Sequence, residues 1–107
     1  MVPGMTPRTV SQVIVEPKAG LLVVLQGDGL KPYEYIYREA NGLRWNNERR
    51  AVHAYEPSRW EHAELLRHVA HTVREAFGEE LLLSPSTEWV GISPELKAEL
   101  CEVLSQQ

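Results

Sequence analysis

Apolar positions follow a period of two in the first half of the chain and a helical period in the second half. Residues 10–15 and 21–25 are apolar runs joined by a turn that contains Pro17 and Gly20. The second run is apolar on both faces, which predicts a central strand, and residues 50–55 predict a further strand. Strands followed by helices indicate an α+β domain rather than an alternating α/β domain.

Residues 33–38 alternate tyrosine with other residues, which predicts a strand with Tyr33, Tyr35 and Tyr37 on one face of the sheet. The dipeptide Asn41-Gly42 is the preferred two-residue hairpin turn, so this strand is predicted to pair with the residues that follow. The register gives the pairs Glu39–Arg44, Arg38–Trp45, Tyr37–Asn46 and Glu34–Arg49. Asn46-Asn47 is an alternative place for a turn.

Two helices are predicted in the second half of the chain. The first covers residues 59–77, because Ser58 and Glu61 form a capping box and Gly78 supplies a left-handed residue at its end. The second begins after Ser93, with Pro94 in its first turn. Their apolar stripes are Ala63, Leu66, Val69, Ala70, Val73 and Phe77 in the first helix, and Leu96, Leu100, Val103 and Leu104 in the second.

These elements, with residues 81–83 as an edge strand, predict an α+β fold: an antiparallel sheet of four to five strands with two helices packed on one face. Residues 1–8 are predicted to be a flexible N-terminus, and residues 9–107 a single domain of ordinary size.

Charge is distributed unevenly along the 107 residues, which have a net charge of −4. Residues 75–107 contain seven glutamates and one lysine, so this third of the chain repels phosphates and anionic lipid. We therefore expect no duplex nucleic acid and no membrane as partner. The chain has no long apolar segment and no signal peptide at its start, which predicts a cytoplasmic location.

The candidate metal ligands and nucleophiles do not form a known motif. His68 and His71 share one side of the predicted helix, but two imidazoles alone leave a zinc site incomplete; Glu64 or Glu75 could complete it, although solvated surface histidines are the favoured interpretation. Cys101 lacks a nucleophile motif and is predicted to be a semi-buried structural thiol. Phosphate-binding loops, dinucleotide motifs and nucleophile elbows are absent from the sequence. We therefore predict no catalytic residues, no metal and no cofactor.

Aromatic and basic residues concentrate between positions 33 and 60. Tyrosine, tryptophan and arginine combine contact area with polar groups and are enriched at binding hot spots. The predicted ligand or interface residues are Tyr33, Tyr35, Tyr37, Arg38, Trp45, Arg50, His53 and Tyr55. Three interpretations are open: a subunit interface, a small-ligand pocket, or rings that simply pack over a small sheet. The basic run 44–50 also has the composition of a single-strand nucleic-acid patch, but the predicted pairing of its arginines with glutamates favours a salt-bridged hairpin.

Several of these segments together resemble a known class of proteins. The segments are residues 35–38, Asn41-Gly42-Leu43-Arg44-Trp45, and Trp60 followed by Leu65-Leu66 in a capped helix. They are similar to small orphan proteins encoded on integron-type mobile gene cassettes of the mobile metagenome, over residues 21–83. The resemblance implies a small α+β protein, often oligomeric, without an assigned activity or catalytic residues.

The leading functional hypothesis is a small soluble homo-oligomeric binding or interaction protein that uses the aromatic hairpin face. The alternative is a small enzyme or small-ligand-binding protein with a pocket between sheet and helix, which would use His53, Tyr55, Tyr37 or Arg38. A third hypothesis is a regulator that binds another protein through its acidic C-terminal helix. The partner is accordingly a second copy, a small molecule or another protein.

Overall fold

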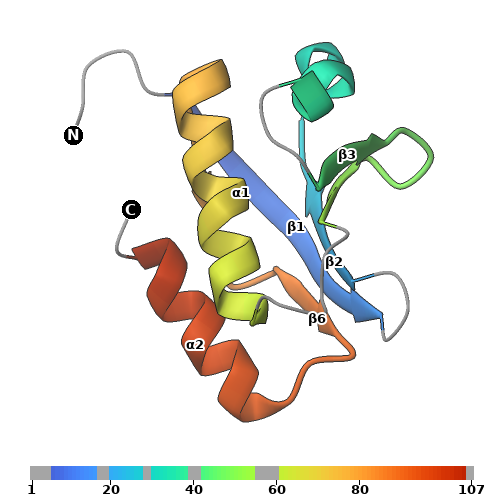
Figure 1. Ribbon diagram of the computed structural model, residues 1–107. Helices are drawn as coiled ribbons and strands as arrows, with labels where there is room; N and C mark the ends of the chain where they lie inside the picture. The colour runs from blue at the N-terminus through green and yellow to red at the C-terminus, as the bar shows by residue number, and fades with distance from the viewer. Residues whose placement is uncertain (1–5, 17–19, 28–29, 39–41, 55–60, 106–107) are drawn as a thin grey trace.

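The computed structural model describes residues 6–16, 20–27, 30–38, 42–54 and 61–105 (Figure 1). Strands dominate the first half and helices the second, as the sequence predicts. In chain order the elements are β1 (Thr6–Glu16), β2 (Gly20–Leu25), the 3-10 helix η1 (Lys31–Arg38), β3 (Leu43–Asn46), β4 (Ala51–Ala54), α1 (His62–Phe77), β5 (Glu79–Leu82), β6 (Glu88–Val90) and α2 (Pro94–Ser105).

The strands form one sheet in the order β3-β4-β2-β1-β5, with β6 also paired to β1. The pairs β1–β2, β2–β4 and β3–β4 are antiparallel, whereas β5 and β6 run parallel to β1. The six described strands therefore make a mixed sheet, where the sequence predicts an antiparallel sheet of four to five strands. The parallel pairs arise because α1 carries the chain across the sheet before β5, as parallel neighbours require.

β1 is a central strand of this sheet because it pairs with other strands along both of its edges. Its residues 6–9 pair with β5 and its residues 12–14 pair with β6, so two short strands share one edge. Between them, the Thr87 hydroxyl donates a buried 2.7 Å hydrogen bond to the Val10 carbonyl. The strand begins at Thr6, so residues 6–8 of the segment predicted to be flexible are paired with β5; residues 1–5 lie outside the described part.

A β-bulge in β1 sets which side chains face the helices. The register with β2 shifts between Val10 and Gln12, so Val10 and Val13 both point into the main core although they are three residues apart. The other face of the sheet has a smaller buried cluster of Ile14, Leu22 and Ala51. This places an apolar residue at nearly every position of β2, which is the reason that it is buried on both faces, as predicted.

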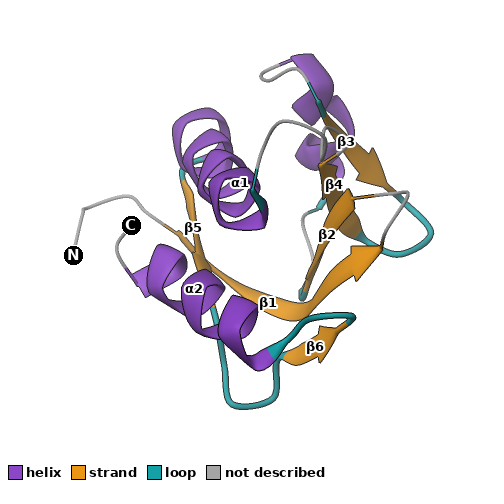
Figure 2. Cartoon of the chain, turned by 60° about the horizontal axis from the view of Figure 1, so that its bottom comes forward, coloured by secondary structure: helices purple, strands orange, loops and turns teal. Residues whose placement is uncertain are grey.

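α1 and α2 pack together on one face of the sheet, as Figure 2 shows. The predicted apolar stripes of both helices belong to the core or pack against it. α1 begins at His62 rather than at residue 59, and its N-cap Glu61 makes no side-chain capping bond; Ser58 lies outside the described residues. The predicted capping box therefore does not start this helix. Gly78 ends it in the left-handed conformation with φ 65°, as predicted.

The predicted tyrosine hairpin is wrong. Residues 33–38 form η1 instead of a strand, and β3 pairs with β4, with Leu43 opposite Ala54 and Asn46 opposite Ala51. The turn lies at residues 47–50, the place that Asn46-Asn47 offers as the alternative. Arg49 pairs with Glu16 on β1 at 2.6 Å, not with Glu34. Asn41 and Glu39 lie outside the described residues.

The class is nevertheless α+β with helices on the sheet, as the sequence predicts. In the part of the chain that the structure describes, none of the helices has the length and apolar character needed to span a bilayer.

Candidate functional site

η1 presents two tyrosines to solvent because it buries every third residue. Tyr33 and Ile36 are buried at 1% and 0% exposure, and Leu30 precedes them at the same spacing. A 3-10 helix has three residues per turn, so this spacing lines up one apolar side. Tyr35 and Tyr37 consequently point away from the core and remain 50% and 44% exposed. The three tyrosines predicted to share one face therefore lie on different sides.

Tyr33 holds η1 against the rest of the molecule. Its ring lies between Trp45 and Phe77, with centroid distances of 5.4 and 4.7 Å. Its hydroxyl donates a hydrogen bond to the Glu79 carboxylate at the start of β5. Ring packing and the hydrogen bond together fix the position and orientation of the helix.

An ion pair completes this buried network. Arg8 on β1 donates to both carboxylate oxygens of Glu79, at 2.6 and 3.3 Å, and to the Gln26 carbonyl at 3.0 Å. Burial, and then the hydrogen bond to the carboxylate, raise the pKa of Tyr33 well above its ordinary value of 10.0. The same carboxylate raises the pKa of Arg8. The phenol therefore stays protonated as a donor and the guanidinium stays charged.

Three exposed side chains of η1 and one of β3 lie together at the surface. We call them the aromatic–arginine cluster: Tyr35, Tyr37 and Arg38 from η1, and Arg44 from β3. The Arg38 guanidinium carbon lies 4.8 Å from the Tyr35 ring centroid and 5.7 Å from that of Tyr37. The guanidinium of Arg44, from β3, lies 6.0 Å from the Tyr37 ring. These distances are those of cation–π contacts, so the rings and cations hold one another in place at the surface.

The remaining predicted site residues lie elsewhere. Trp45 faces the core side of β3 and contacts Tyr33. Arg50, with φ 53°, belongs to the β3–β4 turn and donates to the Gly27 carbonyl at 2.7 Å. His53 is 8% exposed on β4, on the sheet face opposite α1, and is the register neighbour of Arg44. Tyr55 lies outside the described residues.

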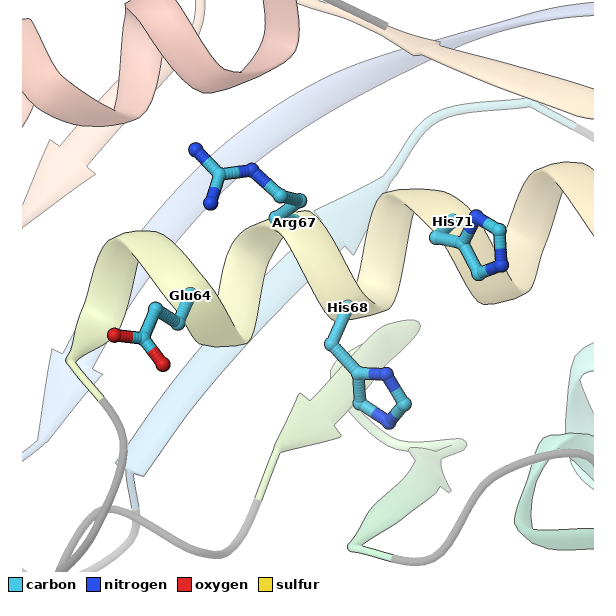
Figure 3. Close-up of a pocket in the computed structure, with 4 residues that line it drawn as sticks. All are labelled: Glu64, Arg67, His68 and His71. Atoms are coloured by element: carbon cyan, nitrogen blue, oxygen red, sulfur yellow. The ribbon is translucent and has the colours of Figure 1, made fainter.

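A shallow hollow lies on the outer side of α1. It has a volume of about 450 Å³ and is lined by Glu64, Arg67, His68 and His71, all from this one helix. Figure 3 shows that Arg67 and His68 extend in different directions, so the polar groups do not converge on a point. Within the described residues, no group of three or more histidine, cysteine, aspartate or glutamate side chains is arranged to hold a metal ion. Cys101 is half-buried on α2.

Comparison with known proteins identifies the class of this chain. It is 30% identical to a protein of known structure, the Integron Cassette Protein Hfx_Cass5 from the mobile metagenome of the North West Arm Sewage Outfall. The alignment covers 95% of this chain and 99% of that one. The chain belongs to the integron cassette proteins. The resemblance expected from residues 21–83 thus extends over nearly the whole length of this cassette protein.

The superposition of the two structures has a TM-score of 0.43, so the assignment rests on sequence identity and coverage rather than on the fold. No protein-family model and no curated protein matches this cassette protein. The name of its relative states a class and a source but no ligand or activity. Function must therefore be argued from the surface of the molecule itself.

Proposed function

We propose that this cassette protein is an oligomeric binding protein that contacts its partner through the aromatic–arginine cluster. The observation that supports it is a pair of half-exposed tyrosine rings with guanidinium groups stacked on them. Large apolar side chains exposed together are uncommon on a monomer surface, and tyrosine and arginine dominate binding hot spots. The cytoplasmic location that the sequence predicts is part of this proposal.

Preorganisation is the second argument. A binding surface loses affinity when its side chains must be ordered on association. Here the buried contacts of Tyr33 fix η1, and the cation–π contacts restrict Tyr35, Tyr37 and Arg38. Much of the ordering cost is therefore met during folding rather than during binding.

The test is the association state of a Tyr35→Ala/Tyr37→Ala variant. Sedimentation velocity at micromolar concentrations should show self-association of the wild type, and the variant should associate at least about tenfold more weakly, the loss of one hot-spot contact. Leu82→Ala is the matched control, because Leu82 is also an exposed apolar residue, at 38%, but lies on β5. Equal association of the wild type and the double variant would contradict the proposal, as would a wild type that stays monomeric.

The hollow on α1 favours a second candidate function, the binding of a small acidic molecule. Its volume is within the range of ligand pockets, and the Arg67 guanidinium offers donors to a carboxylate. Titration of the labelled protein with small organic acids should then shift the amide signals of residues 64–71. Shifts that are equal in wild type and Arg67→Gln would eliminate this site.

A further inference from the structure

The aromatic–arginine cluster offers positive charge that no carboxylate of the described residues neutralises. Arg38 and Arg44 are exposed, and in the described part of the chain neither forms an ion pair with a carboxylate. Glu34 is also exposed on η1, but no ion pair joins it to either arginine there. By contrast, Arg8 and Arg49 are paired with glutamates of their own chain. The cluster is therefore suited to a partner that carries carboxylates.

α2 presents such carboxylates in a row. Glu95 and Glu99 are exposed and lie four residues apart, at the flank of the apolar face that contains the buried Leu100 and Val103. We call these two glutamates the acidic stripe. Residues at this spacing are neighbours on a helix surface, and like charges there destabilise the helix.

The end of α2 adds to this negative potential. Its last turn contains no basic residue, although a cation is the favourable charge at a helix C-terminus. Lys97 lies near the Trp89 ring instead, at 5.6 Å from its centroid. On α1, in comparison, the exposed Glu64 and Glu75 are accompanied by two arginines, Arg67 and Arg74. The acidic stripe is thus the surface whose self-repulsion a cationic partner would relieve.

We propose that the aromatic–arginine cluster of one copy docks on the acidic stripe of a second copy. This inference deepens the proposed function and rests on it. Arginine forks bind carboxylates with two hydrogen bonds, and tyrosine hydroxyls donate to the same oxygens. η1 and α2 lie at opposite ends of the molecule (Figure 1), so the contact joins two unlike surfaces and each copy keeps one of each for a further contact.

Reciprocal charge reversal tests the contact. Arg38→Glu/Arg44→Glu and Glu95→Lys/Glu99→Lys should each lower the association constant about tenfold or more, because each variant opposes like charges at the interface. An equimolar mixture of the two variants should associate again, since each now carries the surface that matches the other. Sedimentation equilibrium at low and high salt measures both effects, and the association of the wild type should weaken at high salt.

The control is Glu75→Lys/Glu80→Lys, which makes the same change in net charge outside both surfaces and should leave association unchanged. Circular dichroism melts check that each variant folds. If Glu95→Lys/Glu99→Lys associates like the wild type, or the mixture does not recover, the inference is wrong. The proposed function would survive that result if Tyr35→Ala/Tyr37→Ala still dissociates, because the cluster would then bind another surface.

Discussion

At the scale of single residues, two glycines with positive φ differ in whether a side chain would have room. Gly91 follows β6 with φ 69°, and a Cβ there would collide with the Val15 carbonyl oxygen. Gly78 has a similar φ of 65°, but its Cβ position is open, with no atom within 4 Å. A substitution at Gly78 therefore measures the strain of the left-handed backbone alone, and a substitution at Gly91 measures that strain together with a steric clash.

Replacing these glycines with alanine should give two different losses of stability. Gly78→Ala should cost about 1–2 kcal/mol, the price of a left-handed alanine. Gly91→Ala adds a clash with the backbone, for which overpacking costs of about 1–3 kcal/mol are typical, so its total should be clearly larger. Urea denaturation of both variants measures the difference. Equal losses would mean that β6 shifts freely away from β1.

Because of Tyr33, the free energy of unfolding should fall as the pH becomes alkaline. Its pKa is raised in the folded protein, so folding favours the protonated phenol, and this stability is complete below the unfolded pKa of about 10. It is lost progressively as the pH rises above that value towards the folded pKa. Tyr33→Phe should lose about 1.5–3 kcal/mol at neutral pH, the value of a hydrogen bond to a charged group, and should lack this alkaline loss.

The measurement is the free energy of unfolding of wild type and Tyr33→Phe from pH 8 to pH 11. Tyr35→Phe is the control, because Tyr35 is half exposed and its loss should change stability by less than about 0.5 kcal/mol. Parallel pH curves for wild type and Tyr33→Phe would show that the phenol of Tyr33 ionises as easily folded as unfolded.

At the scale of elements, two ion pairs of equal length differ in what they hold. Arg8–Glu79 joins β1 to β5 with side chains 11% and 12% exposed, whereas Arg49–Glu16 joins a turn to the end of β1 with side chains 44% and 41% exposed; both measure 2.6 Å. Burial removes the competition from water, so breaking the first pair deprives the Arg8 guanidinium of its carboxylate inside the molecule.

Glu79→Gln should therefore destabilise the protein by about 3–5 kcal/mol, and Glu16→Gln by at most about 1 kcal/mol. Thermal or chemical denaturation of the two variants provides the comparison. The Glu79 variant should also loosen η1, because Tyr33 donates to the same carboxylate. A similar small loss in both variants would show that water enters the Arg8 network.

The sequence predicts most elements but not the one that carries the candidate site. β1, β2, β4, α1 and α2 follow from apolar runs and helical periodicity, because their burial repeats at the period of the element. The strand predicted at residues 33–38 is wrong because two patterns overlap there. Tyr33, Tyr35 and Tyr37 recur at a period of two, whereas the buried residues Leu30, Tyr33 and Ile36 recur at a period of three. Pro32 near the start of η1 is a further helical signal. Two patterns competed in one segment, and packing against Trp45 and Phe77 decided between them.

Arg44 illustrates why the members of the site could not all be found. Its place in the aromatic–arginine cluster depends on β3 pairing with β4, which turns Leu43 and Trp45 to the core and Arg44 to the outer face. The parallel neighbours β5 and β6 likewise depend on the path of α1 across the sheet. Local sequence patterns do not determine which distant segments pair in the sheet.

At the scale of the whole molecule, β1 connects the two ends of the chain. It pairs with β2, which follows it directly, and with β5 and β6, which follow more than sixty residues later. Contacts of this sequence separation make folding slower than in helical proteins of the same size. Because β1 pairs with strands on both of its edges, its backbone hydrogen bonds should break only when the whole molecule unfolds.

Hydrogen exchange should therefore show a graded pattern. Amides in the centre of β1 and β2, such as those of Val13 and Val23, should exchange only by global unfolding. Amides of η1 should exchange faster, because among the described residues this helix pairs with no strand through its backbone. Mass spectrometry or NMR of the exchanging protein measures both groups. Faster exchange in β1 than in η1 would contradict the central position of this strand.

The hydroxyl of Thr87 has a consequence for how related chains can vary. It occupies the gap that β5 and β6 leave on the edge of β1, and the Ser84 amide donates to the same oxygen at 2.9 Å, so residues 84–87 close on themselves. One residue added to or removed from this loop would move the Thr87 hydroxyl away from the Val10 carbonyl. That buried carbonyl would then lose its hydrogen bond to Thr87. Cassette relatives with this sheet should accordingly keep the loop at constant length while other surface connections lengthen and shorten.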